Sequence, residues 1–299
     1  MTTNNGLLLI DKPRGVTSHD VVARVRKVLG ERRVGHAGTL DPMATGLLVL
    51  AVGPSTRLLR FAQGETKQYE GVVTLGIATD SLDADGAVTE RREVPALDVE
   101  AVNNFAARML GPQLQTPPMV SAIKVGGQRL HALARQGVEV EREPRAVTIS
   151  SFSLAATEHH NQWSFVVTCS PGTYVRVLLS DLAVALGTVG HLSALRRIAS
   201  GDHLVTDAVD LEDLAARVDR GEEVLAPPSL FVAGLESVVV SSEQVSRLRQ
   251  GQRVELEERR GEEIAAMNDA GDLVAVLRRR GATWQPVVVL PSDPPTAPR

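Results

Sequence analysis

The segment GHAGTLDP at residues 35–42 places one acidic side chain where it could do chemistry. Asp41 directly precedes a proline, which disfavours the helical conformation and holds the aspartate extended. Gly35 and Gly38 permit a tight backbone approach, and the apolar run that begins at Leu47 is typical of a buried strand. A carboxylate on a rigid loop beside a buried sheet is a reasonable place for a catalytic group. An Asp-Pro pair also favours an Asx turn, and the local sequence alone favours that alternative.

Other catalytic arrangements find little support in the sequence. Cys169 is the one cysteine, so no intrachain disulfide can form and a reducing cytosol is the expected compartment. No Cys and His spacing typical of a metal site occurs, and His159 and His160 lie in a polar stretch expected to face solvent. A second well-placed carboxylate motif, which a glycoside hydrolase would need, is absent. The phosphate-binding loop of nucleotide hydrolases is absent as well.

Composition and charge are those of an ordinary globular chain with an uneven charge distribution. The 299 residues are 43% hydrophobic and 23% charged, with a formal net charge of -4. A negative net charge alone argues mildly against a nucleic-acid partner. However, residues 1–64 carry nine Lys or Arg against four acids. That local excess indicates either a phosphate-binding face or merely an uneven solvated surface.

The elements that must position Asp41 mix strands and helices without a regular βαβ order. Apolar runs and one alternating stretch predict four strands in the larger part of the chain, at residues 7–10, 47–52, 71–77 and 162–169. Caps and apolar stripes predict four helices, at residues 18–29 with Ser18 as cap, 98–111, 174–186 and 210–218. This mixture predicts an α+β fold with a mixed, mostly antiparallel sheet flanked by helices.

Two shifts in composition predict the organisation of the chain. Residues 113–145 contain Pro-Pro and Gly-Gly pairs with two basic clusters, and they predict a long insertion, of the kind that is usually functional or mobile. The charged and then proline-rich stretch at 220–229 predicts a boundary between a large domain, 1–228, and a small domain, 229–291.

The small domain is expected to be a β-barrel. Short glycine-punctuated strands are predicted at residues 238–240, 254–256, 264–267, 273–277 and 287–290, with a helix at 242–249. Residues 292–299 contain three prolines and are expected to form a disordered tail. No apolar run reaches membrane-spanning length and the N-terminus lacks a signal-peptide pattern, so a cytoplasmic protein is expected.

Five motifs, in order along residues 6–201, resemble those of the TruB family of tRNA pseudouridine synthases. The most specific is GHAGTLDPMATGLL at 35–48, which resembles the family signature. Two others, KPRGVTS at 12–18 and KQYEG at 67–71, resemble the family's N-terminal and conserved-tyrosine motifs. Residues 115–127 resemble its RNA-clamping insertion, and CSPGTYVR at 169–176 resembles the motif with its active-site arginine. The C-terminal stretch resembles the PUA RNA-binding domain.

The resemblance implies catalytic roles for three residues. Asp41 would be the nucleophile that assists cleavage of the C1′–N1 bond, after which the uracil rotates and rejoins through C5. Carboxylates can stabilise or trap positive charge at C1′, and both a covalent and a glycal route remain open. Arg176 would pair with Asp41 and keep it ionised. Tyr69 would stack on the uracil and could help remove the C5 proton. The reaction requires neither cofactor nor metal.

Further residues are expected to contact the RNA. His36 would hold the uridine after it leaves its stack, and Tyr174 would either line the pocket or pack in the core. The basic residues expected to contact phosphates are Lys12, Lys124, Arg129, Arg135, Arg196 and Arg197. The sequence departs from the family at His131, where a tyrosine is usual and a stacking role is in doubt, and at Ala183, where glycine is commoner.

The resemblance therefore predicts an enzyme that isomerises the uridine at position 55 in the T-loop of tRNA. It implies a protein that binds the T-arm and requires no protein partner. The sequence has no obvious coiled coil or large apolar stripe, so a monomer is expected. Two alternatives stay open, namely a synthase of the same family acting on another RNA and an RNA-binding or tRNA-folding protein without catalysis. The presence of Asp41, Tyr69 and Arg176 together favours catalysis over binding alone.

Overall fold

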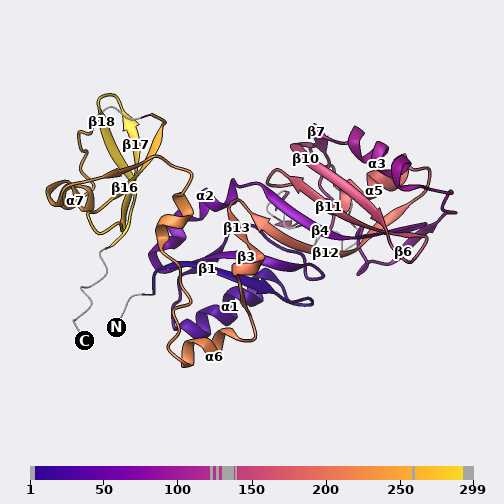
Figure 1. The fold of residues 1–299 in the computed structure, drawn as a ribbon, viewed down its shortest axis with the longest axis horizontal. Coiled ribbons are helices and arrows are strands. Elements are labelled where there is room, and N and C mark those ends of the chain that lie inside the picture. Colours follow the sequence, from indigo (N-terminus) through magenta and orange to yellow (C-terminus); the bar gives the residue numbers. More distant parts are fainter. Residues whose placement is uncertain are drawn as a thin grey trace.

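The computed structural model has a large sheet and a separate small sheet near the C-terminus (Figure 1). It describes residues 4–121, 124–125, 128–129, 138, 140–257 and 260–291. The tail expected at 292–299 lies outside the described residues. Within the described ranges, no helix is long and apolar enough to cross a membrane.

The large sheet contains ten strands in the order β14-β1-β3-β12-β4-β11-β10-β7, with β2 paired to β3 and β13 paired to β12. Their bounds are β1 (Gly6–Lys12), β2 (Val34–His36), β3 (Thr45–Val52), β4 (Lys67–Leu75), β7 (Gly111–Gln115), β10 (Arg145–Ala156), β11 (Gln162–Cys169), β12 (Gly190–Ser200), β13 (His203–Leu204) and β14 (Val209–Asp210). The pairs β1–β14 and β12–β3 are parallel and the other pairs are antiparallel. The predicted mixed, mostly antiparallel sheet is confirmed.

Helices cover part of this sheet and connect its strands. The α-helices are α1 (Ser18–Leu29), α2 (Leu59–Gln63), α3 (Val99–Arg108), α5 (Val175–Ala185), α6 (Leu214–Asp219) and α7 (Ser242–Arg249). Short 3₁₀ helices are η1 (Gly53–Leu58), η2 (Val205–Asp207) and η3 (Pro228–Val232). A further two-stranded pair, β5 (Ile77–Thr79) with β6 (Val88–Arg91), projects from the end of β4.

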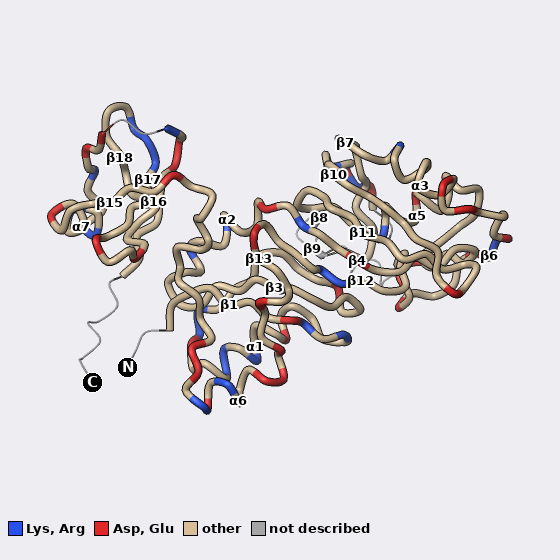
Figure 2. The backbone as a smooth tube through the Cα atoms, in the orientation of Figure 1, with Lys and Arg blue, Asp and Glu red and all other residues tan. Residues whose placement is uncertain are grey.

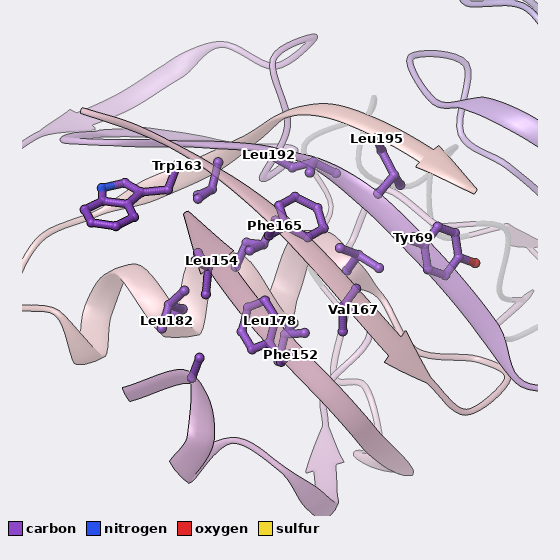
Figure 3. Packing of buried hydrophobic residues seen from close by; sticks show 14 of the residues in the cluster. Tyr69, Phe152, Leu154, Trp163, Phe165, Val167, Leu178, Leu182, Leu192 and Leu195 are labelled. Carbon is purple, nitrogen blue, oxygen red and sulfur yellow. The ribbon is translucent and has the colours of Figure 1, made fainter. Parts of the chain in front are cut away.

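The alternation at residues 162–169 produces the predicted two-faced strand. Trp163, Phe165 and Val167 of β11 are buried in one core cluster with Leu178 and Leu182 of α5. Figure 3 shows these side chains gathered between the strands and the helix. The period of two places every second residue on the same face, so α5 is fixed against the sheet by its apolar side.

The start of α1 corrects the predicted cap. Thr17, not Ser18, is the N-cap, and it forms a capping box with Asp20. Ser18 is buried instead, and its hydroxyl bonds the backbone of Leu40. The expected end is confirmed, because Gly30 closes the helix in the left-handed conformation.

Several other boundaries move because long-range pairing decides them. α3 ends at Arg108, and Gly111, expected to end that helix, instead begins β7. The insertion expected from residue 113 therefore leaves the sheet only after Gln115, the last residue of β7. Residues 209–210, expected within or beside a helix, pair with β1 as β14.

The C-terminal sheet has the order β15-β16-β17-β18, with bounds β15 (Ser237–Val239), β16 (Glu263–Met267), β17 (Leu273–Arg280) and β18 (Thr283–Val289). The helix at 242–249 is confirmed as α7 and contacts β17 and β18. The strand expected at 254–256 is reduced to one bridge between Val254 and Trp284. The class of fold, an α+β body with a small β-rich C-terminal part, is as expected.

Candidate active site

Asp41 lies in the loop between β2 and β3, and several contacts fix that loop. The Leu40 backbone is bonded by Ser18, and the Pro42 carbonyl accepts from Gly15 N at 2.8 Å. A turn forms when Ala44 N donates to the Asp41 carbonyl at 3.0 Å. The turn expected of an Asp-Pro pair is thus made by the backbone, and the carboxylate remains available.

Arg176, at the start of α5, is the partner of Asp41. Its Nε lies 3.0 Å from Asp41 Oδ2. The rest of the guanidinium is bound by the Ser81 carbonyl at 2.7 Å, the Val120 carbonyl at 3.0 Å and Asp83 Oδ2 at 3.4 Å. Only 2% of Arg176 is exposed. A planar guanidinium with its donors engaged in this way has one orientation, which fixes the geometry of the Asp41 pair.

Asp83 is a site residue that no sequence motif indicated. It is buried, and Oδ1 accepts from the Ser81 hydroxyl and from Asp85 N while Oδ2 faces Arg176. Leu82 lies between Ser81 and Asp83, two of the residues that bind Arg176. It has a φ of 63°, a conformation that costs a non-glycine residue roughly 1–3 kcal/mol. The turn-forming residues at 79–86 could have marked a tight turn, but no local signal directs it at an arginine 95 positions away.

Opposing influences act on the Asp41 carboxyl. Burial raises its pKa, Arg176 lowers it, and Asp83 raises it. The side chain is 37% exposed, and that exposed part opens into a cavity. Asp41 is therefore reachable by a ligand while Arg176 favours its charged form.

Tyr69 and Arg197 face each other across β4 and β12, where they are paired in register. Burial raises the Tyr69 pKa, and the neighbouring Arg197 guanidinium lowers it. The same guanidinium donates from Nε to the Leu47 carbonyl at 2.7 Å and from Nη2 to the Gly38 carbonyl at 3.2 Å. With 1% of it exposed, Arg197 cannot reach a phosphate. The structure corrects that expectation and makes Arg197 a strut between Tyr69 and the Asp41 loop.

Lys12 is likewise corrected. It is fully buried, and its ammonium donates to the carbonyls of Pro13, Val16 and Pro42 at 3.0, 2.8 and 3.4 Å. Burial lowers the pKa of Lys12 to about 8. A lysine so enclosed bonds the turn after β1 to the Asp41 loop and is not available to RNA.

Arg196 lies apart from the cavity that contains Asp41. Neighbouring residues in a strand point to opposite faces, so Arg196 faces away from Arg197. It forms a two-pronged ion pair with Asp11 on β1. Its guanidinium is already paired, which does not support the expected phosphate contact at this cavity.

The cavity at Asp41 has a volume of about 480 Å³. Tyr69 and Tyr174 line it, and contact of Tyr174 with RNA remains a prediction. His36 lines the cavity too, and burial lowers its pKa. Its ring packs edge-to-face against the His19 ring, with the two ring centroids 5.6 Å apart. Arg145, which the motifs did not indicate, also lines the cavity and is exposed.

Three of the expected RNA contacts lie in the insertion. Lys124 and Arg129 pair through their backbones as β8 (Lys124–Val125) and β9 (Gln128–Arg129). Arg135 and His131 lie outside the described residues. In the described ranges, no group of three His, Cys, Asp or Glu side chains is arranged to ligate a metal.

Comparison with known proteins places this site in a family. Models described as "TruB family pseudouridylate synthase (N terminal domain)", "tRNA pseudouridylate synthase B C-terminal domain" and "tRNA Pseudouridine synthase II, C terminal" match residues 26–175, 176–243 and 235–291. In fold, the chain is similar to a protein in a structure titled "Structure of H/ACA RNP bound to a substrate RNA containing 2'-deoxyuridine". The TM-score is 0.73 at 22% identity, over 96% of this chain and 85% of that one.

Two curated relatives carry the name tRNA pseudouridine synthase B. The one from Leifsonia xyli subsp. xyli is 44% identical over 97% of both chains. The one from Streptococcus pneumoniae serotype 4 is 40% identical over 94% of this chain and 98% of the relative. The fold and the site define a pseudouridine synthase. The chain belongs to the TruB family.

Proposed function

We propose that this protein isomerises uridine to pseudouridine in tRNA. One observation carries the proposal. The Asp41 carboxylate lines a cavity, forms an ion pair with the buried Arg176, and shares that cavity with Tyr69. The volume of about 480 Å³ lies within the roughly 300–1,000 Å³ typical of small-molecule sites. A single flipped nucleotide is the part of an RNA that such a cavity could admit.

The chemistry follows from these groups. Flipping the uridine costs a few kcal/mol, and stacking on Tyr69 would offset part of that cost. Asp41 assists cleavage of the C1′–N1 bond by meeting the positive charge that develops at C1′. The uracil rotates, C5 bonds to C1′, the C5 hydrogen leaves as a proton and N1 takes up a proton. Tyr69 lines the same cavity as Asp41 and could assist that transfer, with the Arg197 guanidinium nearby lowering its pKa against the effect of burial.

We propose the uridine at position 55 in the T-arm as the target, as expected for this family. The names of the relatives support a tRNA substrate. We propose that the protein acts as a monomer and requires no protein partner. The buried single cysteine, Cys169, is compatible with action in the reducing cytoplasm.

The first test is the Asp41→Asn variant with a T-arm stem-loop. We expect pseudouridine formation to fall below detection while the dissociation constant for the RNA changes little, because the amide keeps the size of the carboxylate but not its charge. Tritium release from C5-labelled uridine measures turnover, and filter binding measures affinity. Turnover by Asp41→Asn near the wild-type rate would refute the role of Asp41. Mapping pseudouridine in total tRNA after deletion of the gene tests position 55.

A further inference from the structure

Two buried polar side chains outside the catalytic set make the same unusual contact. The Ser18 hydroxyl accepts from Leu40 N at 2.9 Å and contacts the Leu40 carbonyl at 3.2 Å. The Gln115 amide accepts from Tyr174 N at 2.7 Å and donates to the Tyr174 carbonyl at 3.1 Å. Each side chain therefore satisfies both backbone groups of one residue. Ser18 is 1% exposed and Gln115 is 5% exposed.

The two bonded residues stand beside the two members of the catalytic ion pair. Leu40 directly precedes Asp41, and Tyr174 is the N-cap of α5, two positions before Arg176. The Tyr174 side chain makes no capping bond to that helix, so Gln115 supplies the side-chain anchor at its start. Ser18 and Gln115 themselves do not line the described cavity. They reach the catalytic groups only through the backbone.

Buried backbone groups need hydrogen-bond partners, and a lost partner releases the segment or leaves an unsatisfied group. Asp41 lies in a loop and Arg176 in the first turn of α5, 135 positions further along the chain, so the 3.0 Å separation of the two side chains depends on how the loop and the start of the helix are anchored. Reactions at enzyme sites are sensitive to this geometry, since a 1 Å displacement can cost roughly 100-fold in rate.

We propose that Ser18 and Gln115 are positioning residues that set the Asp41–Arg176 separation, one from each side of the pair. The inference rests on the proposed function for its kinetic readout, but not for its structural one. It adds two members to the site that neither touch the substrate nor carry charge.

The pKa of the Asp41 carboxyl depends on its separation from Arg176, because the guanidinium favours the ionised carboxylate. The other groups that face or act on Asp41 are Asp83 from the β5–β6 turn, Lys12 from β1, Tyr69 from β4, and Tyr174 beside α5. Substitution of Ser18 or Gln115 alters none of these charges. If Arg176 moves away, the Asp41 pKa should rise, since burial already raises it.

The test uses the full chain with Ser18→Ala, Gln115→Met and the double variant. We expect each single variant to lower kcat by about 10- to 100-fold with KM for the stem-loop changed less than about threefold. The acid limb of the kcat profile should move to higher pH. The double variant should lose less than the product of the two single effects, because both act on one ion pair. Ser18→Thr, which keeps the hydroxyl, should restore most of the rate.

Matched variants separate positioning from stability. Thr17→Ala removes the cap of the same helix, and Gln113→Met alters the same strand, where the Gln113 side chain donates to the Met109 carbonyl. Both should lower the melting temperature without moving the acid limb. The Asp41 pKa is also measured directly by an NMR titration of the carboxyl carbon, assigned with Asp41→Asn.

Unchanged Asp41 pKa and unchanged kcat in Ser18→Ala and Gln115→Met would overturn the inference. So would losses no larger than those of Thr17→Ala and Gln113→Met. If the wild-type protein modified no uridine in any tRNA, the proposed function would fail, and the NMR titration would still decide whether Ser18 and Gln115 position the pair.

Discussion

At the scale of single residues, the site contains several charged groups that are buried from water and bound by ion pairs or backbone hydrogen bonds. Asp41 and Asp83 share Arg176, while Lys12, Lys67 and Arg197 are buried nearby. Lys67 donates to the carbonyls of Ala62 and Glu65 at 3.0 and 2.7 Å. Bonds to backbone carbonyls let these cations stay buried, and the same bonds tie the catalytic loop to its neighbours.

The burial of Lys12 predicts a pH dependence of stability. Its pKa is about 8 in the folded protein, against 10.5 for the unperturbed group. Between these values the unfolded chain binds more protons than the folded one, so stability from this group rises with pH. The unfolding free energy of the wild type relative to Lys12→Met should increase by up to about 3 kcal/mol from pH 8 to 10.5, less where water screens the ammonium.

Urea denaturation at several pH values measures this difference, and Lys67 cancels because both proteins contain it. A difference that stays constant from pH 7 to 10.5 would show that Lys12 titrates normally. The slope of RNA affinity with salt gives a second check. It should be the same in Lys12→Met and wild type, because a buried ammonium neutralises no phosphate.

At the scale of elements, the decisive feature is the parallel contact of β3 with β12. Arg197 is paired with Gly46, and a Cβ at Gly46 would collide with the Arg197 carbonyl oxygen and lie 2.8 Å from the Arg197 backbone nitrogen. Gly46 also has a φ of 97°. A glycine is therefore required at position 46 for β12 to approach β3 closely. That approach places Arg197 where it bonds the Gly38 carbonyl of the Asp41 loop.

Gly46→Ala should lower the free energy of unfolding by more than about 3 kcal/mol, because it adds a backbone clash to an unfavourable φ. Gly187→Ala is the matched control. Gly187 has a φ of 83°, and a Cβ added there would have no atom within 4 Å, so it should cost only about 1–2 kcal/mol. Chemical denaturation compares the two. If both variants lost the same free energy of unfolding, the close approach of β12 would not be the reason for a glycine at position 46.

At the scale of the whole molecule, the C-terminal sheet is joined to the large sheet by an apolar cluster and by charge. Leu273, Val276 and Val288 belong to the same core cluster as Leu7 and Leu47 of the large sheet. Arg60 of α2 and Arg278 of β17 both bind Glu263. The domain boundary expected at 228/229 remains a prediction. The 3₁₀ helix η3 begins at this point and packs against α2 of the large domain.

The end of β17 offers a test of RNA binding by the C-terminal part. Figure 2 shows basic residues along this strand, and Arg279 and Arg280 are exposed at its end, whereas Arg278 is paired. Replacing Arg279 and Arg280 with Ala should weaken tRNA affinity, leave kcat at saturating RNA unchanged, and reduce the salt slope by about 1 for each lost phosphate contact. An unchanged affinity and slope would argue against RNA contact at this end of β17, and Arg253→Ala provides a surface-charge control.

Local sequence was enough to predict most of the elements and the identity of the central residues. Alternation predicted β11, apolar spacing predicted α1, and the motif resemblance selected Asp41, Tyr69 and Arg176. These are signals carried by neighbouring residues, since periodicity and turn chemistry are local.

Which charges are buried and which are paired depends instead on how distant segments fold together. Lys12 and Arg197 are of types that usually lie on the surface, and nothing near them in sequence indicates otherwise. Arg197 is buried because β12 pairs with β3, where its guanidinium bonds the Leu47 carbonyl 150 positions away. Lys12 is buried because the Asp41 loop packs against the turn after β1, where the Lys12 ammonium bonds backbone carbonyls of both segments. Asp83 was missed for the same reason. Its role exists only where a turn after β5 meets α5, and long-range packing, not local pattern, sets that contact.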